Sequence, residues 1–487
     1  MNAIYSAQSK IRKDFGLRKV KVIHNQNYQR HGTKSYVYLM KRFGFQPTKE
    51  GPFYHVERIQ QRGLVPEKFK AAIGGRVQKQ QVLVKKTGSG KDPAHGEVTA
   101  DDQQNDSEYL CKVQIGKPVQ SLMLDFDTGS ADTWVRSASQ SSSSQSGHNV
   151  FNPKKSNTFK ELTGKTWKIQ YGDGSTASGN CGADTLIVGG LSIHNQTIEL
   201  ATKMSKEFEQ GTGDGLLGLA WSKINTVKDA GEPDPQATPV ENMIKQEDIP
   251  KEAELFTSCF YSTRDAGTDD ASPKESFYTF GYIDQDLVKQ SGEDIHWVDV
   301  DNSEGFWSFP SASASINGQA VAATAAESAG SGSSSDNTAI ADTGTTLALL
   351  SDTVVDALYK AIPGAKYDYS NQGYIFPVST AAADLPEFRV AVGDKEFLIQ
   401  KEDLAFAPTD DGKHWYGGVQ SRGTLTFDIL GDTFLKSCYC IWDQGNKRFG
   451  VVPKIEKTQN LTPPSDSGAG DGEKVKVFST DMVGLDE

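Results

Sequence analysis

Short runs in which apolar residues alternate with polar ones dominate the chain from about residue 96 to residue 453. Clusters of Gly, Asn, Asp and Ser separate these runs, and this texture is typical of β-strands joined by turns. The pattern therefore predicts a mostly β fold. Its clearest predicted strands cover residues 109–116, 167–171, 276–281 and 424–430.

Two stretches carry a helical pattern instead. Residues 35–44 are predicted to form an amphipathic helix that Gly44 and Pro47 end. Residues 351–362 are predicted to form a helix that begins with a Ser351 cap and closes before Pro363. Two low-complexity stretches rich in Ser, Ala and Gly are predicted to be surface insertions, at residues 137–146 and 322–335.

One apolar stretch occurs twice in the chain. Residues 122–134 and 339–350 each place an apolar run before an Asp-Thr-Gly triplet and a hydroxyl residue after it. The first triplet begins at Asp127 and the second at Asp342, 215 residues later. This offset is too long for a stacked repeat and suits two copies of one domain.

A second element recurs in the same order. An apolar-apolar-Gly sequence ends at Gly218, 91 residues after the first Asp, and again at Gly431, 89 residues after the second. Two features at nearly equal spacing indicate duplication, and the boundary between the copies is predicted near residues 284–293.

Charge is distributed unevenly around this duplicated body. The whole chain carries a net charge of −12, but residues 1–95 contain 20 Lys and Arg against 5 Asp and Glu. This basic segment could bind nucleic acid through phosphates, or it could mask the acidic body and loosen when carboxylates are protonated. No nucleic-acid-binding motif accompanies the charge, so the mask is favoured. The turn-rich residues 85–95 are a predicted cleavage region.

Other composition signals exclude several classes. The five cysteines do not form a disulfide framework, and Cys438 and Cys440 are predicted to be buried thiols on one strand face. Scattered histidines and the absence of a second paired ligand set argue against zinc. No run approaches the length of a membrane span, and the first twenty residues lack the apolar core of a signal peptide.

Two Asp-Thr-Gly turns in a duplicated context predict a catalytic carboxyl pair. A pseudo-twofold arrangement would bring Asp127 and Asp342 together, and two close carboxyls cannot both ionise, so they share a proton. The ionised member can activate a water while the protonated member polarises a carbonyl, which is peptide hydrolysis without metal or covalent intermediate. Asp125 lacks the following Thr-Gly and receives no catalytic role. A haloacid-dehalogenase-like reading of residues 125–129 fails because its fifth position is Gly129 and alternating helices are missing.

With these motifs in hand, residues 96 to about 455 resemble the pepsin-like aspartic endopeptidases, most closely the fungal acid proteases. The resemblance implies two homologous β-rich lobes with the active-site cleft between them and no cofactor or metal. It implies that Asp127 and Asp342 are catalytic. Residues that would support them are Thr128, Gly129, Ser130, Thr343, Gly344, Thr345 and Trp134, and residues that would bind substrate are Tyr171, Gly172 and Asp173 of a flap hairpin and Thr346.

The resemblance also implies a zymogen. Residues 1–95 would be an activation propeptide that inhibits through Lys41 and Arg42, residues 96–287 and 288–455 the two lobes, and 456–487 a disordered acidic tail. The expected activity is cleavage of proteins or peptides at acidic pH, with preference for large apolar residues and, through Asp173, acceptance of Lys. The expected enzyme is a monomer that binds neither nucleic acid nor membrane, secreted or vacuolar although no signal peptide is seen.

The chain departs from the family pattern in two ways, and one alternative function is kept beside the endopeptidase. The usual second-lobe disulfide is missing, because Val378 and Tyr416 stand at its two positions. The signal peptide is missing, and Asn105, Asn195 and Asn460 are only candidate glycosylation sites. The alternative function is a catalytically inactive pepsin-fold binding or inhibitor protein, against which the two intact triplets argue.

Overall fold

The protein is described from a computed structural model. The described residues are 12–25, 28–53, 109–170, 176–209, 211, 213–262, 275–323 and 337–454. The predicted cleavage region, most of the predicted insertion at residues 322–335, the flap residues Tyr171, Gly172 and Asp173, and the predicted tail at 456–487 lie outside them. Within the described ranges, no helix combines the length and apolarity that crossing a bilayer requires.

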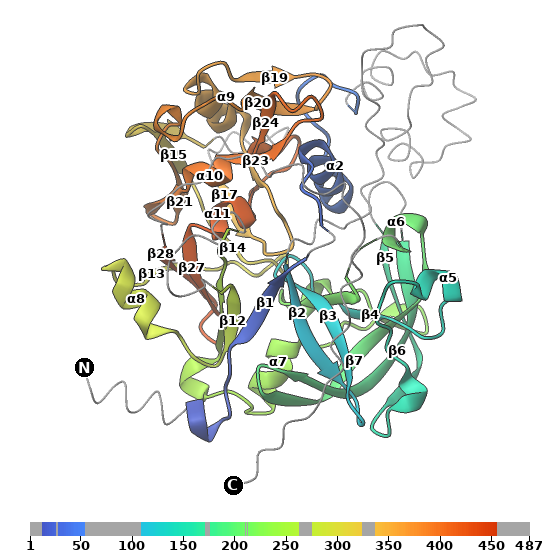
Figure 1. Cartoon of the computed structure of the whole chain (residues 1–487). Helices are drawn as coiled ribbons and strands as arrows, with labels where there is room; N and C mark the ends of the chain where they lie inside the picture. Colours follow the sequence, from blue (N-terminus) through green and yellow to red (C-terminus); the bar gives the residue numbers. More distant parts are fainter. Residues whose placement is uncertain are drawn as a thin grey trace, which may run out of the picture.

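β-Strands are the dominant regular structure of the described chain and helices are few, which confirms the predicted fold class (Figure 1). The largest sheet runs, in order across it, β10 (Glu232–Pro233), β9 (Lys228–Asp229), β5 (Lys160–Gln170), β6 (Thr176–Val188), β7 (Leu191–Met204), β4 (Thr133–Arg136), β8 (Gly215–Gly218), β3 (Gln120–Asp127), β2 (Tyr109–Ile115), β1 (Val20–His24), β12 (Phe277–Phe280), β11 (Leu255–Cys259), β27 (Cys438–Asp443), β28 (Arg448–Pro453) and β13 (His296–Asp299).

Three smaller sheets belong to the second half of the chain. The first contains β14 (Ser308–Pro310), β17 (Thr338–Ala341), β26 (Asp428–Leu430), β18 (Ala348–Leu350) and β25 (Val419–Ser421). The second contains β16 (Gln319–Ala322), β15 (Ser313–Ile316), β21 (Phe388–Val392) and β22 (Lys395–Ile399). The third contains β19 (Lys366–Asp368), β20 (Gly373–Pro377), β24 (His414–Gly417) and β23 (Ala405–Pro408).

The helices are short and lie mainly around these sheets (Figure 1). They are α2 (Gly32–Phe43), α5 (Ser142–Gln145), α6 (Lys206–Glu209), α7 (Pro239–Lys245), α8 (Gln285–Ser291), α9 (Asp352–Lys360), α10 (Lys401–Leu404) and α11 (Asp432–Leu435). The predicted boundary between the two copies coincides with α8, which Asp284 caps and Gly292 ends in a left-handed conformation at φ 72°.

The two halves repeat one strand arrangement. In the first half, β3 runs parallel to β8, β8 antiparallel to β4, and β4 parallel to β7. In the second half, β17 runs parallel to β26, β26 antiparallel to β18, and β18 parallel to β25. The recurring sequence motifs therefore correspond to a recurring local structure.

The described part of the basic N-terminal segment, residues 12–25 and 28–53, packs into the fold. Strand β1 pairs antiparallel with β2 on one edge and with β12 on the other, and Val20 and Val22 are buried while Lys21 is exposed. The alternation follows the period of two that a strand imposes on side chains. Residues 20–24 thus bridge strands from the two sides of the large sheet.

Helix α2 follows β1 and packs on the second half of the chain. The sequence prediction of a helix ending at Gly44 is confirmed, since Gly44 has φ 67°, but the helix begins three residues earlier, at Gly32. Its apolar side chains enter one buried cluster with residues of β17, β18, β20, β23, β24 and β26. The helical members of that cluster are Tyr36, Val37, Tyr38, Leu39 and Met40.

Close packing at the start of α2 yields a testable prediction. A Cβ atom on Gly32 would lie 1.9 Å from Cγ of the Tyr416 ring, inside van der Waals contact. Ala is the better helix former, by about 1 kcal/mol, but this overlap costs more than that gain. The variant Gly32→Ala should therefore lower the melting temperature of the full-length chain at neutral pH. A melting temperature equal to or above that of the unmodified chain would show that α2 is not seated on Tyr416.

Three sequence predictions are corrected by the structure. The sequence predicts a strand at residues 424–430, but only residues 428–430, which form β26, are a strand. Residues 423–427 form turns and bends instead, and Thr424 exchanges hydrogen bonds with Gln46 of the segment that follows α2. Ser351 stands at the start of α9, but its side chain makes no capping bond. Residues 137–146 are not a simple surface insertion, since Ser137, Gln140 and Ser144 are buried and Ser144 donates to Glu209.

The cysteine prediction holds. All five cysteines are free and buried, and Cys438 and Cys440 lie two apart on β27. Burial raises the pKa of the Cys438 thiol to about 12, which keeps it protonated and unreactive. No group of residues in the described ranges has the composition of a metal site.

Candidate active site

The two Asp-Thr-Gly triplets begin where parallel strand pairs end. Asp127 is the last residue of β3 and lies opposite Gly218 of β8. Asp342 follows β17, and its backbone N–H donates to the carbonyl of Leu430 on β26 at 3.0 Å. In each half, hydrogen bonding between two buried parallel strands thus fixes the position of the aspartate.

The glycine that ends each apolar-apolar-Gly element allows the loops to approach. A Cβ atom on Gly218 would lie 2.6 Å from the Ala131 backbone, and one on Gly431 would lie 2.3 Å from the Thr345 carbonyl oxygen. Any larger residue would push the loop that follows the aspartate out of position. This steric demand explains why a glycine stands at both positions.

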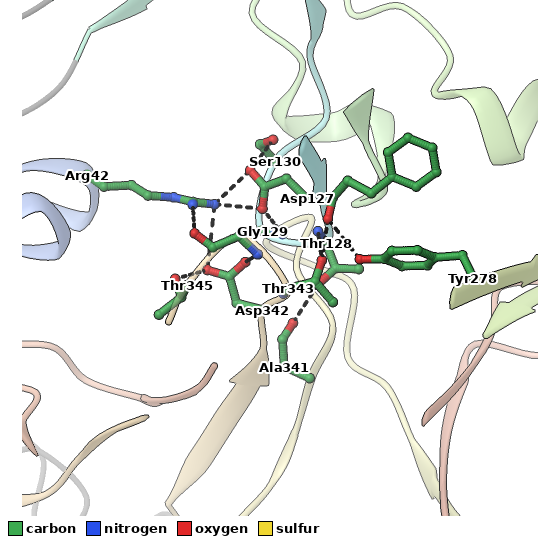
Figure 2. Close-up of polar contacts among 12 residues, drawn as sticks. Arg42, Asp127, Thr128, Gly129, Ser130, Tyr278, Ala341, Asp342, Thr343 and Thr345 are labelled. Atoms are coloured by element: carbon green, nitrogen blue, oxygen red, sulfur yellow. Dashed lines mark hydrogen bonds and ion pairs between the residues drawn. The ribbon is translucent and has the colours of Figure 1, made fainter. Parts of the chain in front are cut away.

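Thr128 and Thr343 join the two halves by reciprocal hydrogen bonds (Figure 2). The Thr128 N–H donates to Thr343 Oγ1 at 3.1 Å, and the Thr343 N–H donates to Thr128 Oγ1 at 3.0 Å. Each hydroxyl then donates to a carbonyl of the opposite strand, Thr128 to Ala341 and Thr343 to Phe126. Both threonine side chains are buried, so these bonds are shielded from water.

Each aspartate accepts the same pair of bonds from its own loop. For Asp127, the Gly129 N–H donates to Oδ1 at 2.8 Å and the Ser130 hydroxyl to Oδ2 at 2.6 Å. For Asp342, the Gly344 N–H donates to Oδ1 at 3.0 Å and the Thr345 hydroxyl to Oδ2 at 2.5 Å. The predicted supporting residues of both loops therefore surround the two carboxyls as a symmetric set.

Arg42 of helix α2 reaches between the two aspartates (Figure 2). Its Nη2 donates to both carboxylate oxygens of Asp127 at 2.8 Å and lies 3.6 Å from Asp342 Oδ2. Its Nη1 donates to the Gly344 carbonyl at 2.7 Å. The guanidinium is 8% exposed and the carboxyls 1% or less, so this is a buried, charge-assisted contact.

The environment separates the pKa values of the two carboxyls. Burial acts to raise the pKa of Asp127, but the Arg42 guanidinium and the Ser130 hydrogen bond outweigh it, and the pKa lies below its ordinary value of 3.8. Burial raises the pKa of Asp342 to about 6 despite Arg42, and the negative charge of Asp127 adds to the rise. At mildly acidic pH the pair therefore carries one proton.

The other predicted site residues have different surroundings. Trp134 stacks on Trp167 at a centroid distance of 6.1 Å, while the predicted flap residues Tyr171, Gly172 and Asp173 lie outside the described residues. Thr346 is buried, and its carbonyl accepts from Thr433 of α11. Lys41 is buried in α2.

The ends of the flap hairpin are described. Strands β5 and β6 pair antiparallel with Gln170 opposite Thr176, so the predicted flap residues connect two paired strands. The stack of Trp134 on Trp167 lies in the buried cluster beneath these strands.

Sequence reasoning missed residues that support the loops from below. The Tyr278 hydroxyl donates to the Phe126 carbonyl at 3.1 Å, which holds the end of β3. Beneath the second loop, Arg422 Nη1 pairs with Asp428 Oδ1 at 2.7 Å and also donates to Asn337, all buried. Asp428 directly precedes the second apolar-apolar-Gly element, and this position in the sequence could have identified it as a residue that supports the second loop.

Comparison with known proteins agrees with this geometry. The family model described as eukaryotic aspartyl protease matches residues 108–454. Aspergillopepsin-1 of Aspergillus pseudoglaucus is 43% identical over 361 residues, covering 74% of this chain and 82% of that protein. Penicillopepsin-1 of Penicillium rubens is 41% identical, covering 73% and 81%, and penicillopepsin-1 of Penicillium janthinellum is 40% identical, covering 74% and 99%. The chain therefore belongs to the eukaryotic aspartyl protease family, as a pepsin-like aspartic endopeptidase similar to those of fungi.

Proposed function

We propose that the chain is an acid endopeptidase made as a zymogen, with Asp127 and Asp342 as its catalytic pair and residues 1–95 as its inhibitor. The observation that carries the proposal is the contact of Arg42 with both aspartates, because a cation fixed between two carboxyls occupies the space that a water and a peptide bond need. The inhibitory residue would be Arg42, and Lys41 would support the helix that carries it.

The catalytic step follows from a pair that shares one proton. The ionised carboxyl takes a proton from a bound water, whose oxygen attacks the carbonyl carbon of the scissile bond. The protonated carboxyl donates to the carbonyl oxygen and so stabilises the tetrahedral intermediate. The carboxyl that took a proton from the water passes it to the amide nitrogen, and one hydroxyl of the tetrahedral intermediate returns its proton to the other carboxyl as the carbon–nitrogen bond breaks, so the pair is again singly protonated. Gly129, Ser130, Gly344 and Thr345 keep both carboxyls oriented throughout.

Substrate recognition is proposed from the family resemblance. The flap residues Tyr171, Gly172 and Asp173, with Thr346, would bind a protein or peptide with large apolar residues beside the scissile bond. Asp173 would also accept Lys on the amino-terminal side. A monomer that is secreted or vacuolar fits the acidic working range and the fungal relatives, and no cofactor enters the reaction.

Acidification of the purified full-length chain tests this proposal. The pKa of Asp127 is depressed in the folded state, so the Arg42 contact contributes stability above the ordinary Asp pKa and loses it as pH falls through the folded value. The chain should stay intact and inactive at neutral pH, then lose about its first 95 residues and gain peptidase activity below about pH 4. Mass spectrometry and cleavage of an apolar fluorogenic peptide follow both events. An intact mass without cleavage at every acidic pH would instead identify a catalytically inactive binding protein.

A further inference from the structure

The segment that follows α2 crosses the second half of the chain and ends on a surface that the proposed catalytic step does not use. This segment, residues 45–53, passes β19 and β20 (Figure 1). Its Lys49 places Nζ 2.9 Å from Asp356 Oδ1 of α9 and 3.1 Å from Oδ2. The same ammonium group lies 6.0 Å from the ring centroid of Tyr367 and 5.6 Å from that of Tyr374. One carboxylate and two aromatic rings therefore surround a single lysine side chain.

The three groups around this lysine, called the lysine cage below, are held by contacts within the second half. The Tyr374 hydroxyl donates to Asp356 Oδ1 at 2.6 Å, which orients the carboxylate. The rings of Tyr367 and Tyr374 meet edge to face, with centroids 5.5 Å apart and planes at 77°. Tyr374 also stacks on the buried Tyr359 ring at 4.4 Å. Because these contacts do not involve the N-terminal segment, the lysine cage should keep its arrangement when that segment leaves.

Gln372 binds the backbone of the segment beside the lysine cage. The residue is 1% exposed, and its Nε2 donates to the Lys49 carbonyl at 3.1 Å and to the Tyr367 hydroxyl at 2.8 Å. Its Oε1 accepts from the Phe53 N–H at 3.1 Å. A Cβ atom on Gly51 would lie 1.9 Å from this oxygen, so the bound turn approaches the amide too closely for a larger residue. The surface thus recognises a short turn by its backbone and a lysine by its charge.

The start of the segment is anchored as well, and a short length of chain ties it to the catalytic pair. The Gln46 N–H donates to Thr424 Oγ1 at 3.0 Å, and the Thr424 N–H donates to the Gln46 carbonyl at 2.9 Å. Lys49 follows Arg42 by seven residues, which span at most about 25 Å of chain. Since Arg42 lies between the two catalytic aspartates, a peptide bound there can reach the lysine cage through a short connection.

We propose that the lysine cage and Gln372 form an exosite of the mature enzyme, which binds a lysine-bearing turn of a protein substrate outside the cleaved sequence. The inference rests on the proposed function, because the cage becomes free only when residues 1–95 leave. The Asp356 side chain is 50% exposed even with Lys49 in place, so a substrate can reach it from solvent. A contact far from the reacting atoms binds ground state and transition state equally, so it lowers KM and leaves kcat unchanged.

Matched peptide substrates test the exosite. Each carries one apolar cleavage site, joined through a flexible Gly-Ser linker able to span about 25 Å to a tail with the sequence of residues 45–53. The second peptide of each pair has the tail substitution Lys49→Ala, and the pairs are made with the tail before and after the site. With acid-activated enzyme at about pH 5, the lysine tail should lower KM roughly ten-fold relative to the alanine tail in one of the two orders, with equal kcat. Mass spectrometry verifies that cleavage occurs at the intended bond.

Variants of the enzyme link the tail effect to the lysine cage. Asp356→Asn removes the charge that faces the ammonium group and should bring the KM values of the two tails together. Tyr374→Phe keeps the ring but loses the hydroxyl that orients Asp356, and it should leave an intermediate difference. Asp384→Asn removes an exposed carboxylate elsewhere in the second half and should keep the full difference. The comparison is between two tails within each variant, so a general loss of activity is not mistaken for loss of the exosite.

The outcomes separate the exosite from the peptidase. Equal KM values for the two tails in both orders would overturn the exosite, and so would a tail effect that persists in Asp356→Asn. A short peptide that holds the cleavage site alone reports on the proposed function. If the chain cleaves this peptide but does not distinguish the tails, the exosite alone is wrong. If the chain neither sheds its N-terminal segment nor cleaves the short peptide at any acidic pH, both proposals are wrong.

Discussion

Replacement of Asp127 by Asn is expected to reduce peptide cleavage at acidic pH by about 10³-fold, because the pair loses the group that exchanges a proton with the attacking water. Asn can still accept the Gly129 bond through its carbonyl oxygen, and its amide NH2 can donate to the Ser130 hydroxyl in place of the bond that the carboxylate accepted, so the loop should keep its conformation. The measurement is kcat/KM for an apolar peptide at about pH 4, together with the melting temperature, which should change little.

Asp125 provides the matched control for this variant. It lies two residues earlier on β3, it is also buried, and it receives none of the bonds that surround Asp127 from Gly129 and Ser130. Asp125→Asn should therefore keep cleavage within a few-fold of the unmodified chain. Equal losses in the two variants would point to general damage of β3, and retained cleavage in Asp127→Asn would end the case for this catalytic pair.

Replacement of Arg42 by Ala is expected to make the full-length chain release its N-terminal segment from the two aspartates at a higher pH than the unmodified chain does. Removing one partner of a buried charged contact costs about 3–5 kcal/mol, which is at least 10²-fold in the balance between docked and undocked segment. The Arg42 charge also lowers the pKa of Asp127, so without it the pair should hold its single proton at less acidic pH. Self-removal of the N-terminal segment and peptide cleavage should both appear near pH 5 to 6, where the unmodified chain is silent. A pH series followed by mass spectrometry and peptide cleavage measures this.

Three control variants test whether the effect of Arg42→Ala comes from the loss of the Arg42 contact with the aspartates. Lys41→Ala removes the adjacent basic residue of α2 and keeps Arg42, whose guanidinium contacts both aspartates, so it should leave the activation pH unchanged. Arg42→Lys keeps the charge but loses the two-oxygen contact with Asp127 and should give an intermediate pH. The double variant Arg42→Ala with Asp127→Asn should stay intact, since the chain would then lack its own means of cleavage. Activation of Arg42→Ala at the same pH as the unmodified chain would exclude Arg42 as the inhibitor.

Much of the site could be predicted from local sequence because its chemistry is local. Gly129, Ser130, Gly344 and Thr345 bind the aspartate that lies two or three residues before them, so a short motif carries the whole arrangement. Duplication supplied the remaining step, since two equal loops related by symmetry bring their carboxyls together.

Contacts between distant segments could not be predicted in this way. Arg42 and Lys41 are adjacent and both basic, and only the rotation of α2 on its apolar cluster decides that Arg42 reaches the aspartates. Residues 137–146 look like a flexible serine tract, yet Ser137, Gln140 and Ser144 are buried, and Ser144 donates to the half-buried Glu209. In each case the contact depends on how distant segments pack together, so it could not be predicted from the local sequence or composition.

The reciprocal bonds between Thr128 and Thr343 have a mechanical consequence. They join the two halves beside the carboxyls, where the two aspartate loops meet, so a rotation of one half against the other would have its pivot there. When two bodies turn about a pivot, points far from it travel a long way and points beside it hardly move. Any opening of the halves that admits side chains of different bulk would therefore leave the separation of the Asp127 and Asp342 carboxyls nearly constant.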